Sequence, residues 1–430
     1  SLMMWALPST GTSPGQSVGK NPVVLDDVEV RVVPQTEWKQ IYVDAWRIMR
    51  DWFYDTGMHG VDWDAMLERY LPLVERVTDR AELSDAIAQM VAELSALHTF
   101  VRGGDLRAGD DTIPPASLGA VLARDEGAGG YRVDHVYRHD PDEPDRAAPL
   151  ARPGVEVAAG DVIVQVNGVA ALDAPDVGAL LRHQAGKQVR LRVRPADGGE
   201  TRDVIVEPIS TSAEFDLRYH EWEYTRRLAV EEASDGRFGY VHLRAMGGRN
   251  FTEWAKAFYP VFDREGLIID VRHNRGGNID SWILGRLLRK AWFTWTQRVG
   301  NWQFWNQQYA FRGHVVVLCN ERTASDGEAF AEGFRRLGLG KVYGTRTWGG
   351  EIWLTSSNVL VDRGIASAAE FGVYGPEGTW LIEGWGVEPD IVVDNLPHEA
   401  FGGRDAQLEA AIAHLEQRLE EDPIPPLVTP

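Results

Sequence analysis

Apolar residues recur with helical spacing near the start of the chain. Between residues 36 and 100, apolar side chains lie at positions i, i+3 and i+4 in TEWKQIYVDAWRIMRDWFY, DWDAMLERYLPLVERV and RAELSDAIAQMVAELSALH. This spacing places the apolar side chains on one face of each helix, ready to pack against its neighbours. The pattern predicts a small helical domain, which we assign to residues 22–116, with its third helix running to His98.

Short strands replace the helices between residues 117 and 210. The apolar runs LGAVLA, YRVDHVY, DVIVQVNGVA, QVRLRVRP and TRDVIVEP surround one helix-like stretch, APDVGALLRHQAG. PLARPGVEVAAGDVIVQVNGVA resembles part of a PDZ domain, which would bind a peptide C-terminus as an added strand. The resemblance implies that the carboxylate rests on the loop SLGA, at Leu118 and Gly119. The alternative is a β-rich spacer with an occluded groove.

Strands and helices alternate from residue 211 onward. The order is GRFGYVHLRAM, FTEWAKAFYPVFDRE, GLIIDVRHNRGG, SWILGRLLRK, GHVVVLCN, DGEAFAEGFRRLG and KVYGTRTWGG, with a final amphipathic stretch, RDAQLEAAIAHLEQRLEED. This order predicts an α/β core over residues 211–430, in which functional groups gather at the carboxyl ends of the strands. The aromatic-rich segment AWFTWTQRVGNWQFWNQQY is expected to be buried or to form an interface.

Composition narrows the classes of partner. Lys and Arg number 44 and Asp and Glu 64, so the formal charge is −20 and a nucleic acid partner is not expected. A single cysteine, Cys319, excludes an internal disulfide and fits a reducing compartment. No apolar run reaches the length of a membrane span, and SLMMWALPSTGTSPG lacks the basic start of a signal peptide. We therefore expect a cytoplasmic protein without a membrane partner.

One serine lies where a strand is predicted to give way to a helix. Ser325 follows HVVVLCN in ERTASDGEAF, and Glu328 stands three residues later. The S-x-x-E spacing is typical of a capping box, which satisfies free N–H groups at the start of a helix. A hydroxyl held where backbone N–H groups converge can also be a nucleophile facing an oxyanion hole. The two roles are compatible, because the helix dipole at an N-terminus favours both.

Acyl transfer by a serine also needs a base and donors for the oxyanion. Gly276 and Gly277 end the strand IIDVRHNRGGN, and glycine lets backbone N–H groups turn inward. His98, His242 and His273 are candidate bases, and the residues alone do not choose among them. Neither H-E-x-x-H nor a Cys/His cluster occurs, so neither a metal nor another cofactor is expected.

A broader resemblance to a known family chooses among the three candidate histidines. The helical segments leading to SALHT, the PDZ-like module, IIDVRHNRGGN, ERTASDGEAFAEGF, GTRTWGG and IEGWGVEPDIVVDNLP together resemble the carboxy-terminal half of the tricorn protease family. The likeness implies an α/β multidomain protein with a crotonase-like peptidase core, a helical subdomain and an inserted PDZ domain. It also implies a serine peptidase that cleaves unfolded peptides, assembled as a homo-oligomer.

The resemblance assigns roles to individual residues. Ser325 would be the nucleophile, His98 the general base and Glu383 the acidic member. Gly277 and the N–H of Asp326 would form the oxyanion hole, with Gly276 as an alternative donor.

Two departures from the family pattern change what can be expected. The family has a second serine immediately before the base, and this chain has Leu97, which cannot relay a hydrogen bond from its side chain. We therefore expect Ser95, on the same face of a helix reaching His98, or Thr99 to orient the base. The family's amino-terminal propeller domains are also missing from this sequence. Two alternatives remain, an inactive PDZ-bearing scaffold and a crotonase-like enzyme acting on thioesters.

Overall fold

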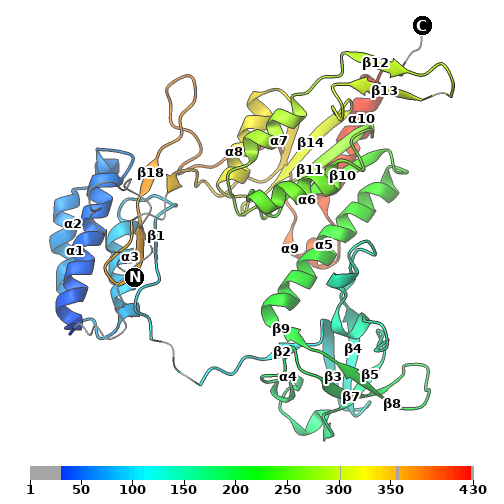
Figure 1. Ribbon diagram of the computed structural model, residues 1–430, viewed down its shortest axis with the longest axis horizontal. Helices are drawn as coiled ribbons and strands as arrows, with labels where there is room; N and C mark the ends of the chain where they lie inside the picture. The colour runs from blue at the N-terminus through cyan, green and yellow to red at the C-terminus, as the bar shows by residue number, and fades with distance from the viewer. Residues whose placement is uncertain (1–30, 108, 110, 301, 355–357, 428–430) are drawn as a thin grey trace, which may run out of the picture. The chain divides into compact units, whose positions relative to one another are not determined.

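The computed structural model describes residues 31–107, 109, 111–300, 302–354 and 358–427 (Figure 1). The predictions that concern residues 1–15 and 22–30 lie outside this range. Contacts divide the described chain into two units. The first comprises residues 31–95, 99–107, 354 and 358–370, and the second contains the rest, including residues 96–98. His98 thus groups with the second unit, whereas the segment near residue 360 joins the helical one.

The first unit contains the three predicted helices and a small sheet. Its elements are α1 (Pro34–Trp52), η1 (Met58–Gly60), α2 (Trp63–Val74), α3 (Arg80–Ala92), β1 (Phe100–Arg102) and β17 (Ile365–Ser367), which pairs antiparallel with β1. Aspartates cap two of the helices: the Asp62 side chain accepts the N–H of Ala65, and the Asp79 side chain accepts that of Glu82. The prediction that the third helix reaches His98 is wrong, because α3 ends at Ala92.

Residues 116–210 form an antiparallel sheet within the second unit. Its elements are β2 (Ala116–Ser117), β3 (Ala120–Asp125), β4 (Gly130–Val136), η2 (Pro144–Arg146), η3 (Pro149–Ala151), β5 (Val162–Val166), β6 (Val169–Ala170), η4 (Ala171–Asp173), α4 (Val177–Leu180), β7 (Val189–Arg194), β8 (Arg202–Val206) and β9 (Ile209–Ser210). The main sheet has the order β3-β4-β5-β7-β8, with β6 paired to β5. Alternate side chains of its strands enter one apolar core. The predicted β-rich module is confirmed, although its helix shortens to one turn.

The remainder of the second unit is built on a parallel sheet of order β10-β11-β14-β15-β19. Its elements are α5 (Thr211–Ala233), β10 (Phe238–His242), α6 (Gly248–Phe258), β11 (Gly266–Asp270), α7 (Asp280–Leu287), β12 (Phe293–Thr296), β13 (Gln303–Asn306), β14 (His314–Cys319), α8 (Asp326–Arg336), β15 (Lys341–Gly344), β19 (Ile391–Val392), α9 (Pro397–Phe401) and α10 (Ala406–Glu421). Two further strands, β16 (Trp353–Leu354) and β18 (Ala369–Phe371), lie where the chain passes between the units.

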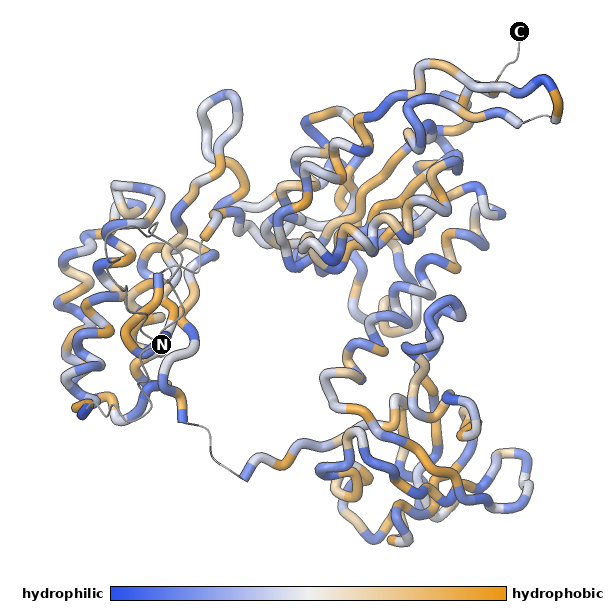
Figure 2. Tube along the Cα trace, in the orientation of Figure 1, coloured by the Kyte–Doolittle hydropathy of each residue, from blue (hydrophilic) through white to orange (hydrophobic). Residues whose placement is uncertain are grey.

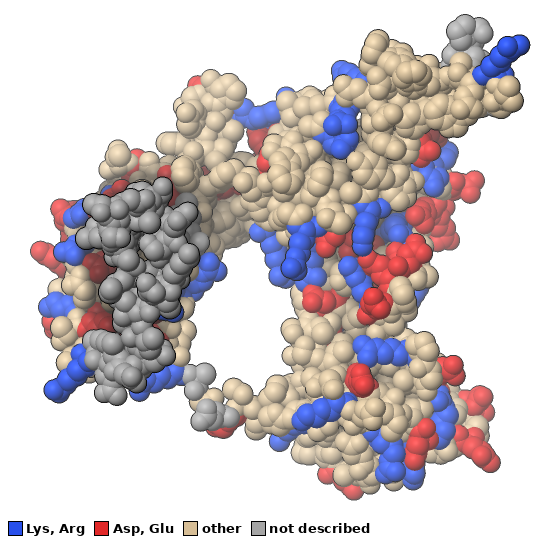
Figure 3. All heavy atoms as spheres, in the orientation of Figure 1, with Lys and Arg blue, Asp and Glu red and all other residues tan. Residues whose placement is uncertain are grey.

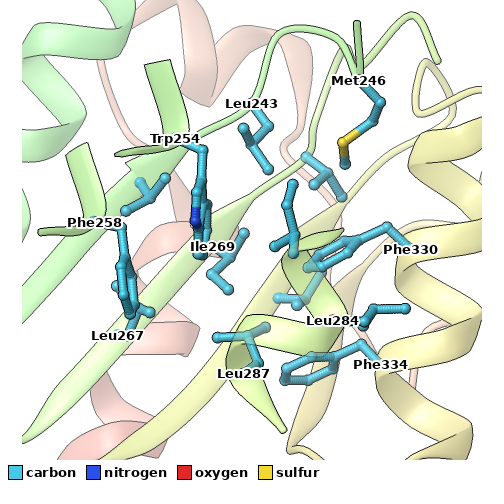
Figure 4. Close-up of a cluster of buried hydrophobic side chains, with 14 of the residues drawn as sticks. Leu243, Met246, Trp254, Phe258, Leu267, Ile269, Leu284, Leu287, Phe330 and Phe334 are labelled. Carbon is cyan, nitrogen blue, oxygen red and sulfur yellow. The ribbon is translucent and has the colours of Figure 1, made fainter. Parts of the chain in front are cut away.

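Helices cover both faces of the parallel sheet. Side chains of α6, α7 and α8 pack on one face with Leu267, Ile269 and Val317, as Figure 4 shows for several of them. Side chains of α5 and α10 pack on the other face with Ile268 and Val316. The central strands β11 and β14 are largely buried and largely hydrophobic, as Figure 2 shows, whereas the edge strand β19 is exposed. The predicted mixed α/β architecture is confirmed.

Two parts of this unit differ from the sequence-based expectation. The long helix α5 was not predicted, because its apolar residues do not gather on one face and only Val230 is buried. The aromatic segment forms the hairpin β12–β13, in which Trp292, Trp295 and Trp302 are each more than half exposed. Burial of these three rings is therefore contradicted, since a two-stranded ribbon covers little of its own surface, whereas the alternative expectation of an interface stays a prediction.

Across the part of the chain that the structure describes, every helix is too short or too polar to cross a lipid bilayer.

Candidate active site

Ser325 occupies a tight turn between a strand and a helix. β14 ends at Cys319, and Ser325 immediately precedes α8 with φ of 55° and ψ of −129°. A positive φ is unfavourable for any residue with a side chain and persists only where its surroundings hold it. The predicted strand-to-helix junction is confirmed. Glu328 accepts the N–H of Ser325 at 3.0 Å, as expected of a capping glutamate.

Glu328 does more than cap the helix. Its buried carboxylate also accepts the Oγ1–H of Thr347 at 2.5 Å and the N–H groups of Gly349 and Gly350 at 2.7 and 2.9 Å. Burial raises the pKa of Glu328, and these donors oppose that effect. One carboxylate therefore fixes the loop 347–350 to the serine turn. The sequence signalled only the cap, because the other donors lie about 20 residues downstream.

The glycine loop after β11 lies against Ser325. Gly276 has φ of 78°, and a Cβ built on it would lie 2.4 Å from Cβ of Ser325, so no larger residue fits. The N–H of Gly276 donates to Oδ1 of Asn274 at 2.8 Å. Among the described residues, the N–H groups of Gly277 and Asp326 have no hydrogen-bond partner. Of the three candidate oxyanion donors, the N–H of Gly276 thus already has an acceptor, and those of Gly277 and Asp326 do not.

Two polar residues join the glycine loop to the serine turn. Asn274 accepts the N–H of Ala324 on its backbone carbonyl at 2.9 Å, and its side chain donates to the carbonyl of Leu243 at 2.6 Å. The Thr323 hydroxyl donates to the carbonyl of Val271 at 2.8 Å. These bonds connect the carboxyl ends of β11 and β14, so the two loops keep one relative position.

The Asp326 side chain adds a further link. Its Oδ2 accepts the N–H groups of Ile279 and Asp280 at 2.6 and 3.1 Å, at the start of α7. Burial and the neighbouring Asp280 carboxylate raise the pKa of Asp326 to about 7. The carboxyl group therefore titrates near neutral pH while it holds α7 beside α8.

His98 is buried beside the loop that Glu328 fixes. Its ring meets Trp348 edge-on, with centroids 5.4 Å apart, and the N–H of Trp348 donates to the carbonyl of Thr323 at 3.0 Å. Burial lowers the pKa of His98 to about 4, so the imidazole is neutral at pH 7. Through Trp348 and Thr323, the histidine and the serine turn belong to one packed region.

Glu383 reaches the histidine segment through the main chain. Its two carboxylate oxygens accept the N–H groups of Leu97 and Glu351, each at 2.9 Å. Glu383 therefore contacts residue 97 through the backbone N–H, and this contact needs no side-chain hydroxyl at position 97. The Leu97 side chain itself is partly exposed. Sequence reasoning identified Glu383 but missed this bond, since backbone N–H groups leave no trace in a sequence.

The geometric reason for choosing Ser95 as a relay is wrong. Because α3 ends at Ala92, Ser95 does not share a helical face with His98; it is exposed, with φ of 50°. Thr99 lies just after the histidine, and its role as the rival relay stays a prediction.

The other two candidate histidines lie beside α5. Nε2 of His242 is hydrogen-bonded to the Tyr219 hydroxyl at 2.7 Å. The His273 ring packs edge-on against Trp222 at 5.5 Å. Both rings thus pack against aromatic side chains of α5.

The predicted carboxylate loop of the PDZ module is partly closed. The N–H of Gly119 donates to Oγ of Ser117 at 2.9 Å, and a Cβ on Gly119 would lie 2.7 Å from Pro149. Leu118 is buried. In this structure the N–H of Gly119 already has an acceptor, and the binding of a peptide carboxylate by Leu118 and Gly119 stays a prediction.

Within the ranges described, no group of three or more His, Cys, Asp and Glu side chains is arranged to hold a metal ion.

Known families match successive parts of the chain. Residues 34–92 match the tricorn protease C1 domain, residues 116–211 the tricorn protease PDZ domain, and residues 237–393 peptidase family S41. None of these descriptions names a thioester-acting enzyme.

Similar proteins agree with the domain matches. Tricorn protease homolog 1 of Streptomyces coelicolor is 38% identical over 421 residues, which are 97% of this chain and 39% of that protein. Tricorn protease of Thermoplasma acidophilum is 29% identical over 384 residues, 89% of this chain and 35% of that protein. The crystal structure of the tricorn protease matches with a TM-score of 0.84 at 28% identity, over 93% of this chain and 38% of that chain.

This chain therefore spans about two fifths of the length of the relatives it matches. It belongs to the tricorn protease family, and it carries matches to the tricorn protease C1 domain, the tricorn protease PDZ domain and peptidase family S41 in that order.

Proposed function

We propose that this chain hydrolyses peptide bonds in unfolded peptides through an acyl-enzyme, with Ser325 as the nucleophile. The observation that carries the proposal is the position of Ser325 in a strained turn beside two uncommitted N–H groups, those of Gly277 and Asp326. Donors without another acceptor can stabilise the negative oxygen that forms when a hydroxyl attacks a carbonyl.

The reaction proceeds in two halves. Oγ of Ser325 attacks the scissile carbonyl carbon while His98 takes the hydroxyl proton, and the carbonyl oxygen becomes an oxyanion between the two N–H groups. His98 then gives the proton to the departing amine, which leaves an ester on Ser325. A water molecule repeats the attack, with His98 again as the base, and releases the carboxylic acid. The neutral imidazole that burial favours is the form this first step needs.

Glu383 acts as a positioning residue for the base. Its bond to the N–H of Leu97 supports this role, because it holds the residue next to His98 in the chain. Its negative charge also favours the imidazolium that forms during the reaction. No side chain at position 97 is required for either effect.

Kinetics with a nucleophile variant test this proposal. We expect Ser325→Ala to lower kcat for an unstructured peptide by about 10⁴-fold or more while the fold is kept, as is typical when a serine nucleophile is removed. Ser212→Ala, an exposed serine of α5, is the matched control and should keep full activity. Hydrolysis that persists unchanged in Ser325→Ala would refute the assignment.

A further inference from the structure

Two carboxyl groups face each other beside the serine turn. Asp326 directly follows Ser325, and only 1% of its surface is exposed. Its Oδ2 accepts two backbone N–H groups, whereas its Oδ1, which is also buried, has no hydrogen-bond donor among the described residues. The acidic side chain next to it is that of Asp280, the first residue of α7. No step of the proposed mechanism uses either carboxyl group.

A proton can supply the missing donor. Two ionised carboxylates repel each other, and a hydrogen bond between two carboxyl groups forms only when one of them is protonated. With one proton shared by Asp280 and Asp326, the buried carboxyl gains a partner and the pair carries one negative charge instead of two. Without it, the unpartnered Oδ1 would bear the cost of a buried charge that lacks a donor. The geometry therefore favours a pair that keeps one proton.

Two other acidic groups surround the pair. Glu328, on the same helix as Asp326, is already bonded to its four donors. Glu351 belongs to the loop that Glu328 fixes. Burial raises the pKa of Glu351 to about 9, and the carboxylates of Asp326 and Asp280 act in the same direction, so Glu351 is neutral at pH 7. The carboxyl group that changes its charge near neutral pH is therefore within the pair.

Within the described ranges, no cation forms an ion pair with either carboxyl group. Arg286 is the only basic residue of α7, and its guanidinium lies 5.8 Å from the centre of the Tyr259 ring. Other carboxylates are paired, as Asp203 is with Arg192 at 2.8 Å, and Figure 3 shows Lys and Arg interspersed with Asp and Glu on the visible surface. The shared proton is therefore what limits the negative charge of this pair.

The charge of the pair matters because of where the Asp326 backbone lies. The N–H groups of Asp326 and Gly277 are the two uncommitted donors proposed for the oxyanion. A second negative charge on the pair would repel the oxyanion where it forms and would offset part of what these donors contribute. The transition state is thus favoured while the pair holds its proton and disfavoured once that proton is lost.

We propose that Asp280 is a positioning residue for hydrolysis: it shares one proton with Asp326, and loss of this proton at alkaline pH slows the attack by Ser325. Burial, and after it the Asp280 carboxylate, raises the pKa of Asp326 to about 7, so the pair carries one negative charge below this pH and two above it. We expect kcat to fall by about 10 to 100-fold above pH 7, the scale of one added charge in a partly buried site. The inference rests on the proposed peptidase function and names what sets its alkaline limit.

The kcat of the full chain for one unstructured peptide, measured between pH 5 and pH 9, tests the inference. In Asp280→Asn the amide can donate to Asp326 at every pH, so the second charge never forms, and kcat at pH 9 should exceed that of the parent chain by about 10-fold or more. If Asp280 only held α7 in place, the same variant would lower kcat at every pH. Asp64→Asn, an exposed aspartate in the first turn of α2, is the matched control and should keep the parent profile.

A second measurement detects the proton without hydrolysis and does not depend on Asp280→Asn folding. Infrared difference spectra between pH 6 and pH 8 report protonated carboxyl groups, and the parent chain should lose one such group that Asp326→Asn lacks. Equal kcat at pH 6 and pH 9 in the parent chain, an alkaline fall that persists in Asp280→Asn, or the same infrared loss in Asp326→Asn would each overturn the proposal. The infrared readout involves no peptide, so it separates failure of this proposal from failure of the Ser325 assignment.

Discussion

The serine turn and the histidine segment are positioned in different ways. Residues 320–328 have bonds to near neighbours, such as Ser325 to Glu328, and also to distant residues, such as Thr323 to Val271, 52 positions away. The segment 96–98 is fixed by a residue far away, because Leu97 and Glu383 are 286 positions apart. The comparison teaches that the nucleophile has local bonds in addition to its long-range ones, whereas the bond from Glu383 that holds the histidine segment is long-range. Substitutions in the serine turn and substitutions around the histidine segment should therefore differ in their effects on activity and stability.

The largest effect should follow from filling the space beside the nucleophile. In Gly276→Ala, the new methyl group would lie 2.4 Å from Cβ of Ser325, at a backbone φ of 78°. We expect kcat to fall by about 10² to 10³-fold, the scale typical of losing one oxyanion donor, because the turn must shift. Gly285→Ala in α7, where the added Cβ meets nothing within 4 Å, should leave kcat unchanged. Near-normal activity in Gly276→Ala would show that the glycine loop does not approach the reacting atoms.

The two glutamates should divide between stability and catalysis. Glu328→Gln replaces one of two oxygens, each of which accepts two donors, with an NH2 group, so two donors lose their acceptor and we expect a destabilisation of about 2–4 kcal/mol in thermal or urea unfolding. Glu383→Gln loses one of two backbone contacts, so we expect kcat to fall about 10 to 100-fold with a smaller loss of stability. A larger loss of stability in Glu383→Gln than in Glu328→Gln would contradict the proposal that Glu328 mainly stabilises the fold and Glu383 mainly supports catalysis.

Glu351→Gln provides the matched control for these variants. Burial raises the pKa of Glu351 to about 9 from 4.5, so its folded form holds a proton that the unfolded chain releases above pH 4.5. The stabilisation that comes from keeping Glu351 protonated is therefore fully present below pH 4.5. The free energy of unfolding then falls as the pH rises from 4.5, and this stabilisation is lost as the pH rises through 9. Replacing it with the neutral amide should stabilise the chain at pH 8, leave it unchanged at pH 4, and preserve kcat.

The pH profile tests the histidine side. The pKa of His98 is lowered to about 4 from 6.5, so kcat/KM should stay high down to about pH 4 before the base is protonated. The same shift means that His98 lowers stability as the pH falls from 6.5 toward 4, where the unfolded chain binds the proton first. Because Asp326 titrates near 7, the profile is best measured in Asp326→Asn. An acid limb at 6.5 in that variant would indicate an exposed base and contradict the buried site.

The smallest effect should come from restoring the family's serine. Because Glu383 holds position 97 through the backbone N–H, Leu97→Ser keeps this bond, and we expect kcat within about threefold of the parent value. A rise of tenfold or more, with unchanged KM, would show that a missing hydroxyl relay limits the base.

The sequence predicted those features that are local. The run HVVVLCN, Ser325 and the helix after it were recognisable because a β-branched strand, a cap and an amphipathic helix lie side by side in the chain. Three helices in the first unit and the β-rich module followed from the same kind of pattern. His98 was selected only by resemblance, since any of three histidines satisfied the local rules.

Features set by tertiary contacts could not be predicted. The helix α5 carries polar and apolar residues all round, so periodicity gave no signal for it. The end of α3 at Ala92 was missed because RAELSDAIAQMVAELSALH has neither a proline nor a glycine to stop the helix. The contacts of Glu328 to Gly349 and Gly350 and of Glu383 to Leu97 involve backbone N–H groups, which every residue except proline has.

Reaction with a fluorophosphonate probe, followed by mass mapping of the labelled peptide, tests the central claim most directly. The account predicts one adduct, on Ser325, which is absent in Ser325→Ala and forms more slowly in His98→Ala, because the base activates the hydroxyl. Glu328→Gln serves as a comparison that disturbs the turn without removing the nucleophile or the base. Labelling of another residue, or no labelling of folded chain at neutral pH, would contradict the assignment of Ser325 as the nucleophile.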